Sequence, residues 1–141
     1  MTTEHTEYKE KKWWGFMAGL LYERESFAIR GAIFEVYREM GSGFVEPVYQ
    51  ECLERELSHR GIPFAAQPEL RLSYKEAPLR QTYRPDIVCH DKIILELKAV
   101  SALSGEHRAQ VMNYLRGSGM RLAFLVNFGH ARSVELERIV L

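Results

Sequence analysis

The chain has 141 residues, of which 46% are hydrophobic and 27% are charged, a composition typical of one globular domain and not of a disordered chain. Its 19 basic and 19 acidic side chains cancel, so a polyanionic partner would require a local basic patch. The longest uncharged apolar stretch, residues 13–22, is too short to cross a bilayer, and we expect no membrane-spanning helix.

The chain begins with a segment that differs from the rest. Residues 1–23 are first polar and then aromatic, with no settled periodicity, and we interpret them as a loosely ordered N-terminal extension or an interaction segment. The remainder, 24–141, is expected to form a single domain. Its cysteines, Cys52 and Cys89, belong to no C-x-x-C pair, which indicates a cytoplasmic protein without disulfide, zinc or iron–sulfur sites.

Two helices are predicted first. Apolar residues recur at helical spacing over 23–40, with Ser26 as a candidate cap and Gly41 as a stop signal. A second helix follows Gly43, carries Pro47 in its first turn and ends at Gly61.

Strands dominate the middle of the chain. Alternating or β-rich segments predict strands over 69–74, 83–89 and 92–100, with a turn at 75–78 and a hairpin turn at 90–91. A helix is expected from Ser104 or Gly105 to about Arg116, and the apolar run 121–128 predicts a strand covered on both faces. The predicted order is α-α-β-β-β-α-β.

Three charged residues on the two central strands carry the chemical hypothesis. Side chains alternate along a strand, so Glu96 and Lys98 share one face. If strands 83–89 and 92–100 pair around a three-residue loop, Asp86 stands directly opposite Glu96, about 5 Å away between Cα atoms. A divalent cation would neutralise these two like charges. A two-residue turn would shift the register and separate them, and an ordinary surface Glu–Lys pair is the structural alternative.

These residue types suit metal-dependent phosphoryl chemistry. Mg²⁺ prefers oxygen ligands, usually one or two carboxylates completed by water and substrate phosphate. The bound ion activates water and polarises the phosphate. Lys98 could orient the water, help deprotonate it or stabilise developing charge.

Additional candidates lie on the two flanking helices. Gln110 and Tyr114 are four residues apart, hence on one helix face with His107, and could reach the rim of the carboxylate site. For Tyr114 the alternative is an amphipathic core position, and for His107 a solvent-facing one. Glu46 starts the second helix and is either a dipole-stabilising acid or a third metal ligand.

An ordered series of motifs supports a family resemblance. Residues 43–49 read GFVEPVY, and residues 94–99 read ILELKA. Over roughly residues 21–128 the chain resembles the GxxExxY family, a branch of the PD-(D/E)XK nuclease superfamily. The other matching segments are Tyr74-Lys75, Asp86, His107, Ala109-Gln110, Asn113-Tyr114-Leu115 and Asn127-Phe128-Gly129.

The resemblance implies an α/β, three-layer, restriction-endonuclease-like core whose mixed four-stranded sheet has helices on both faces. It implies Asp86 and Glu96 as metal ligands and Lys98 as the catalytic group. RecB-like and lambda-exonuclease-like members add a helix-borne Glu and a Q-x-x-x-Y helix, which Glu46, Gln110 and Tyr114 match by position and type.

The function that we expect is hydrolysis of phosphodiesters by a Mg²⁺- or Mn²⁺-dependent nuclease, with DNA favoured over RNA as the substrate. Substrate selection would then come from the core, from a homo-oligomer or from a protein partner. The alternatives are a non-catalytic interaction or regulatory module that keeps the nuclease fold, and an RNA-directed nuclease, which the active site alone does not distinguish.

Overall fold

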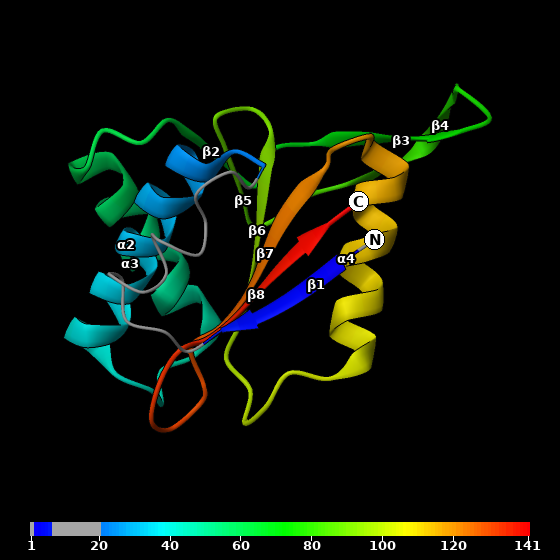
Figure 1. The fold of residues 1–141 in the computed structure, drawn as a ribbon. Helices are drawn as coiled ribbons and strands as arrows, with labels where there is room; N and C mark the ends of the chain where they lie inside the picture. The colour runs from blue at the N-terminus through cyan, green and yellow to red at the C-terminus, as the bar shows by residue number, and fades with distance from the viewer. Residues whose placement is uncertain (1, 7–20) are drawn as a thin grey trace.

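A mixed six-stranded sheet lies at the centre of the protein, with helices on both faces (Figure 1). The computed structural model describes residues 2–6 and 21–141. The sheet order is β1-β8-β7-β6-β5-β2, with β6 and β7 parallel and the other neighbours antiparallel. The helices are α2 (Glu23–Met40), α3 (Glu46–His59) and α4 (Gly105–Ser118), and the strands are β1 (Thr2–Thr6), β2 (Phe64–Ala66), β3 (Leu70–Tyr74), β4 (Ala77–Tyr83), β5 (Ile87–Cys89), β6 (Ile93–Lys98), β7 (Leu122–Asn127) and β8 (Glu135–Val140).

Helices α2 and α3 cover one face of the sheet. Helix α2 spans the predicted residues and ends at Gly41, whose φ of 66° lies in the left-handed region that glycine tolerates. The prediction of Ser26 as its cap was wrong. Tyr22 is the N-cap, and Ser26 is fully buried within the first turns of the helix. Helix α3 begins next to Pro47, as predicted, because the first turn does not need the missing N–H.

Helix α4 covers the opposite face. Ser104 is its N-cap and Gly119 its C-cap, in agreement with the predicted helix. The buried residues divide accordingly into two clusters, one on each side of the sheet. Odd-numbered residues of β6, such as Leu95 and Leu97, pack towards α2 and α3, and Ile94 packs towards α4. This alternation puts Glu96 on the α4 face.

The predicted fold class is confirmed, since a mixed sheet lies between helical layers, but the strand count was too low. The sheet has six strands rather than four, and β3 and β4 form a separate two-stranded sheet. The strand predicted over 83–89 is broken at residues 84–86, so that Tyr83 ends β4 and Ile87 begins β5. The turn predicted over 75–78 is limited to Lys75 and Glu76.

The predicted register between the two central strands is confirmed. Ile87 pairs with Leu95, and Cys89 pairs with Ile93, around a loop of three residues. His90 and Asp91 adopt positive φ angles of 52° and 56°, which the tight reversal requires. The same register, continued by one residue, sets Asp86 opposite Glu96.

The expected N-terminal extension falls partly on described residues. Thr2–Thr6 forms β1, which pairs antiparallel with β8 at the sheet edge, and residues 7–20 lie outside the described part of the chain. Within residues 2–6 and 21–141, no helix has the length and apolar character needed to cross a bilayer.

Candidate active site

Asp86, directly before β5, and Glu96 of β6 are joined by two hydrogen bonds between side chain and backbone. The backbone N–H of Asp86 donates to Oε1 of Glu96 at 3.2 Å, and Oδ2 of Asp86 accepts from the backbone N–H of Leu97 at 2.7 Å. The two side chains therefore do not lie on opposite sides of the sheet, and the register shift that would have separated them does not occur.

A tyrosine that the sequence analysis did not single out touches the same carboxylate. The hydroxyl of Tyr83 donates to Oε1 of Glu96 at 2.5 Å. Its ring stacks on Tyr114 of α4, with centroids 3.4 Å apart and planes 15° from parallel. Gln110 in turn donates from Nε2 to the Tyr114 hydroxyl at 2.8 Å. Gln110 and Tyr114 thus reach the site through Tyr83, while Gln110 itself is exposed.

The signal that could have revealed Tyr83 is Pro85. In an unbroken strand, Tyr83 and Asp86 would point to opposite faces, because their numbers differ in parity. Proline has no N–H for a strand ladder and is rare inside a strand, so its presence argues for a break before Asp86. Because of that break, Tyr83 lies on the face of the sheet that α4 covers, where its hydroxyl reaches Glu96.

Lys98 lies on the same side of β6 as Glu96, two residues further along, and is half-buried. Its positive charge lowers the pKa of Asp86, of Glu96 and of Glu46. One ammonium group therefore acts on all three acidic candidates, whereas the sequence had placed it beside Asp86 and Glu96 alone.

Burial nevertheless dominates the acidity of these carboxyl groups. Glu96 is 7% exposed, and burial, followed by the neighbouring charge of Asp86, raises its pKa to about 7. Burial also raises the pKa of Asp86 and that of Glu46, and for Glu46 the charge of Asp86 adds to the effect. Ionising all of them together near neutral pH is unfavourable unless a cation compensates the charge.

The segment 43–49 places Glu46 at the start of α3. Tyr49 is fully buried, donates its hydroxyl to the carbonyl of Gly41 at 2.6 Å and accepts from the N–H of Phe44 at 3.2 Å. Its ring stacks on Phe128, with centroids 4.6 Å apart. Tyr49 thereby fixes the loop before α3 to the core, and Glu46 takes its position in the first turn.

The backbone of Asp86 is held from the side of α3. Gln50 donates from Nε2 to the carbonyl of Asp86 at 2.9 Å, and the N–H of Gln67 donates to the same oxygen at 3.0 Å. Gln50, which follows directly after the 43–49 motif on α3, was not among the candidates predicted from the sequence. A pocket of about 300 Å³ opens beside these contacts and is lined by Glu46, Pro47, Gln50, Glu51, Glu54, Gln67 and Asp86.

The donor set fits a hard divalent cation held by few protein ligands. In the part of the chain that the structure describes, no group of three or more acidic, histidine or cysteine side chains is arranged to hold an ion. Glu46 is therefore not gathered with Asp86 and Glu96 into a three-carboxylate centre. Two carboxylates are enough for Mg²⁺ or Mn²⁺, which keep several water ligands and take oxygens from a substrate phosphate.

His107 serves the helix rather than the carboxylates. Its Nδ1 accepts from the N–H of Ser104 at 3.1 Å, and its own N–H donates to the Ser104 hydroxyl at 3.4 Å. This reciprocal pair is a capping box that fixes the start of α4. Neither expectation for His107, a place at the rim or a solvent-facing one, anticipated this role.

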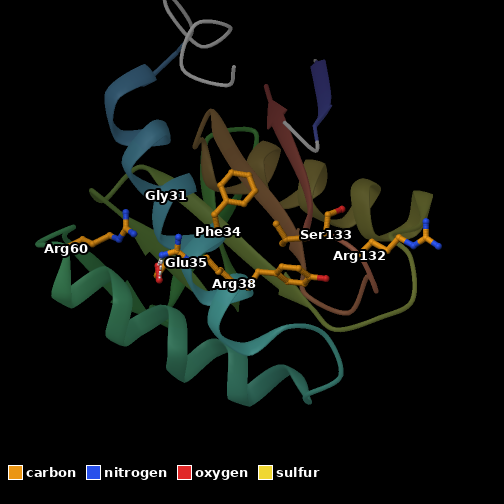
Figure 2. A pocket seen from close by; sticks show the side chains of 9 residues that line it. Gly31, Phe34, Glu35, Arg38, Arg60, Arg132 and Ser133 are labelled. Atoms are coloured by element: carbon orange, nitrogen blue, oxygen red, sulfur yellow. Dashed lines mark hydrogen bonds and ion pairs between the residues drawn. The ribbon is translucent and has the colours of Figure 1, made fainter. Parts of the chain in front are cut away.

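A pocket of about 400 Å³ lies elsewhere, along α2 (Figure 2). Phe34 and the ion-paired Glu35 and Arg38 line it, together with Arg60 and Arg132. None of the three central residues, Asp86, Glu96 and Lys98, lines this pocket. It is therefore separate from the carboxylate site.

Comparison with known proteins agrees with this geometry. Searches of curated proteins and of solved structures gave no match. The family model of the PD-(D/E)XK nuclease superfamily matches residues 23–139, which covers the three helices, the site and all strands except β1, with β8 matched up to residue 139. Nucleases of this superfamily use divalent metals. The chain, with an Asp that follows a proline and an E-x-K strand opposite it, belongs to the PD-(D/E)XK nuclease superfamily.

Proposed function

We propose that this protein is a Mg²⁺- or Mn²⁺-dependent deoxyribonuclease of the GxxExxY branch, close to the RecB-like members, and that it works in the cytoplasm. The observation that supports this most is the meeting of Asp86 and Glu96 across β5 and β6, with Lys98 acting electrostatically on both. The motif at residues 43–49 supports the branch, and two free cysteines support a reducing compartment.

In this proposal Asp86 and Glu96 hold the cation, and Glu46 adds negative charge beside Asp86. When bound, the metal supplies charge neutralisation and acidifies a coordinated water. Lys98 orients the attacking water and stabilises the negative charge that develops on the phosphate. Tyr83 fixes the rotamer of Glu96 through its hydrogen bond, and Tyr114 and Gln110 brace Tyr83 from α4.

A non-catalytic module that keeps the fold is the second candidate. The observation in its favour is that the described residues do not bring a third ligand into the group formed by Asp86 and Glu96. Such a module would still bind a cation through its two carboxylates, but it would leave phosphodiesters intact.

The test compares wild type with Lys98→Ala and with a matched control, Lys92→Ala. Lys92 is also half-buried but pairs with Glu25 on α2, at 3.1 Å. Supercoiled plasmid, linear duplex, single-stranded DNA and RNA are incubated with Mg²⁺, Mn²⁺ or EDTA. We expect metal-dependent cleavage of DNA by wild type and by Lys92→Ala.

Lys98→Ala should lose this cleavage while its melting temperature stays close to that of wild type. Cleavage of RNA alone would transfer the proposal to the RNA-directed alternative. If wild type and Lys98→Ala share the same trace activity on every substrate, the protein is the non-catalytic module.

A further inference from the structure

The β3–β4 hairpin stands apart from the central sheet. It forms its own two-stranded antiparallel ribbon and projects past α4, with its tip clear of the other elements (Figure 1). The tip residues Lys75 and Glu76 have φ angles of 49° and 66°, as in the tight turns of hairpins. Strand β4 has seven residues, which corresponds to roughly 23 Å of extended chain.

One face of the ribbon is anchored to α4. Leu70 packs against the apolar cluster on that side of the sheet, and Leu72 lies against Gly117 in the last turns of α4. At the base, Tyr83 pairs with Leu70 in the ladder and stacks on Tyr114. The ribbon is thus fixed by its inner face, and the opposite face carries the next ladder pair, Arg71 and Thr82.

The exposed side of the ribbon is basic in a chain that is neutral overall. Residues 69–84 hold four basic and two acidic side chains, whereas the whole chain holds 19 of each. Arg71 and Arg80 are both exposed, and Tyr74 at the tip is 64% exposed. The charge of Arg84 is compensated by Glu69 at 2.9 Å. Arg71 donates to the carbonyl of Leu79 at 3.4 Å and Lys75 lies over the Tyr74 ring, contacts that leave their charges uncompensated, so Arg71, Lys75 and Arg80 supply the charge available to a partner.

The surface of α3 beside the site is negatively charged. The pocket beside Asp86 is lined on α3 by Glu46, Glu51 and Glu54. A phosphate backbone is repelled from this acidic surface and attracted to the ribbon. The ribbon also contacts the carboxylate site directly, because β4 ends at Tyr83, whose hydroxyl donates to Glu96.

We infer that the β3–β4 ribbon binds B-form double-stranded DNA by entering its major groove, and that it thereby delivers a backbone phosphate to Asp86 and Glu96. This inference rests on the proposed function and adds the substrate class. The major groove of B-DNA is about 12 Å wide and admits a two-stranded β-ribbon. The major groove of an A-form RNA duplex is too narrow for side chains to read, and a single strand has no groove.

Within the groove, Arg71 and Arg80 would contact phosphates or guanine edges. Thr82 and the neighbouring Gln81 are exposed and can exchange hydrogen bonds with base edges. Phosphate contacts position the protein, and base contacts add sequence preference.

The experiment measures binding of the full chain to short labelled nucleic acids by fluorescence anisotropy, in EDTA so that no cleavage occurs. The probes are a DNA duplex, an RNA duplex of the same sequence and each single strand. The test variant is Arg71→Ala/Arg80→Ala. The matched control is Arg24→Ala/Arg55→Ala, which removes two exposed arginines from α2 and α3. Arg71→Lys/Arg80→Lys serves as a rescue variant, because it restores the charge.

We expect wild type to prefer the DNA duplex. The test variant should lose on the order of tenfold in DNA affinity for each phosphate contact removed, and the slope of log K against log salt should become less steep by about 0.9 for each contact. The control should bind like wild type, and the lysine variant should recover much of the lost affinity. Circular dichroism must show that the alanine variant remains folded.

Two outcomes overturn the inference: equal affinity of the test variant and the control for the DNA duplex, or an equal loss on duplex DNA, duplex RNA and single strands. Lys98→Ala separates this result from the proposed function. If cleavage depends on Lys98 but DNA binding does not depend on the ribbon, the proposed nuclease function is kept and the role of the ribbon in DNA binding is rejected. Duplex binding that depends on the ribbon, with no cleavage by wild type, rejects the nuclease alone.

Discussion

Replacing Glu96 with glutamine should stabilise the protein in the absence of metal. Burial and the charge of Asp86 raise the pKa of Glu96 from its ordinary value near 4.5 to about 7. The folded protein therefore binds this proton more tightly than the unfolded chain, so this group's contribution to stability is complete below about pH 4.5. It is lost as the pH rises through about 7. Glutamine is neutral at every pH and keeps a carbonyl oxygen to accept from Tyr83 and from the N–H of Asp86.

The size of the effect follows from the same shift. A displacement from 4.5 to about 7 corresponds to about 3 kcal/mol of unfavourable ionisation above pH 7. For a chain of 141 residues, this corresponds to an increase of roughly 10 °C in melting temperature for Glu96→Gln at pH 8. Near pH 4.5 the variant and wild type should melt within a few degrees of each other.

Thermal unfolding followed by circular dichroism, in EDTA and across this pH range, measures the difference directly. Mn²⁺ at a thousandfold excess over Kd should reverse the order at pH 8, because binding to the folded state alone then stabilises wild type by about 4.1 kcal/mol, more than the variant's advantage of about 3 kcal/mol. The variant, with one carboxylate fewer, should gain less. If Glu96→Gln melts below wild type in EDTA at pH 8, the ionised Glu96 carboxylate does not destabilise the folded protein and its pKa is not raised.

Three further substitutions test contacts within and beyond the site. Tyr83→Phe keeps the ring but removes the hydrogen bond that lowers the pKa of Glu96. The pH for half-maximal cleavage should therefore rise by up to about one unit. An unchanged pH–rate profile would contradict this. Gly129→Ala places a methyl group against the backbone N and O of Val100 and should cost about 3 kcal/mol, measured as a lower urea midpoint. Asn127→Asp brings a second carboxylate beside the one that Asn127 now contacts, so it should destabilise the protein more at pH 8 than at pH 4, and a loss independent of pH would refute that cause.

Much of the fold was predictable because the local signals agreed with the tertiary structure. Helices α2, α3 and α4 carry apolar stripes bounded by glycine, and β7 is a continuous apolar run that is buried at all six positions. The register of β5 and β6 followed from a three-residue loop and from keeping apolar residues on the core face, since a slip of one residue would reverse both faces.

Strand β8 shows why the rest was not predictable. Its residues Glu135, Glu137 and Arg138 look like an exposed charged segment, yet all three are buried. Glu137 accepts from Arg108 of α4 at 2.6 Å, and Arg138 donates to the carbonyl of Leu21 at 2.9 Å. The partners that allow these charges to be buried are distant in the chain, so hydropathy along the sequence carries no trace of them.

Strand β4, the second strand of the ribbon, was missed for a related reason. Strands β3 and β4 are exposed at most positions, and Pro78 and several charges interrupt any period-two pattern in β4. Local signals of strand structure arise mainly from burial against a core, and this ribbon buries only its inner face. The same exposure that hides it from pattern analysis leaves its outer face open to a partner.

The candidate site depends on one break in the ladder between β5 and β6. In a regular antiparallel ladder, the next residue to bond to β6 would be Pro85, opposite Leu97. Asp86 instead faces β2, and its carbonyl accepts from the N–H of Gln67 and from Gln50 of α3. Its carboxylate replaces the missing backbone acceptor by binding the N–H of Leu97, and its own N–H turns to the carboxylate of Glu96. Each acid is therefore oriented by the other's strand through one oxygen, which leaves the second oxygen of each carboxylate available to a cation. Pro85 makes this exchange favourable, since it has no N–H to lose from the ladder, and the Pro-Asp pair thereby converts the edge of a hairpin into a site.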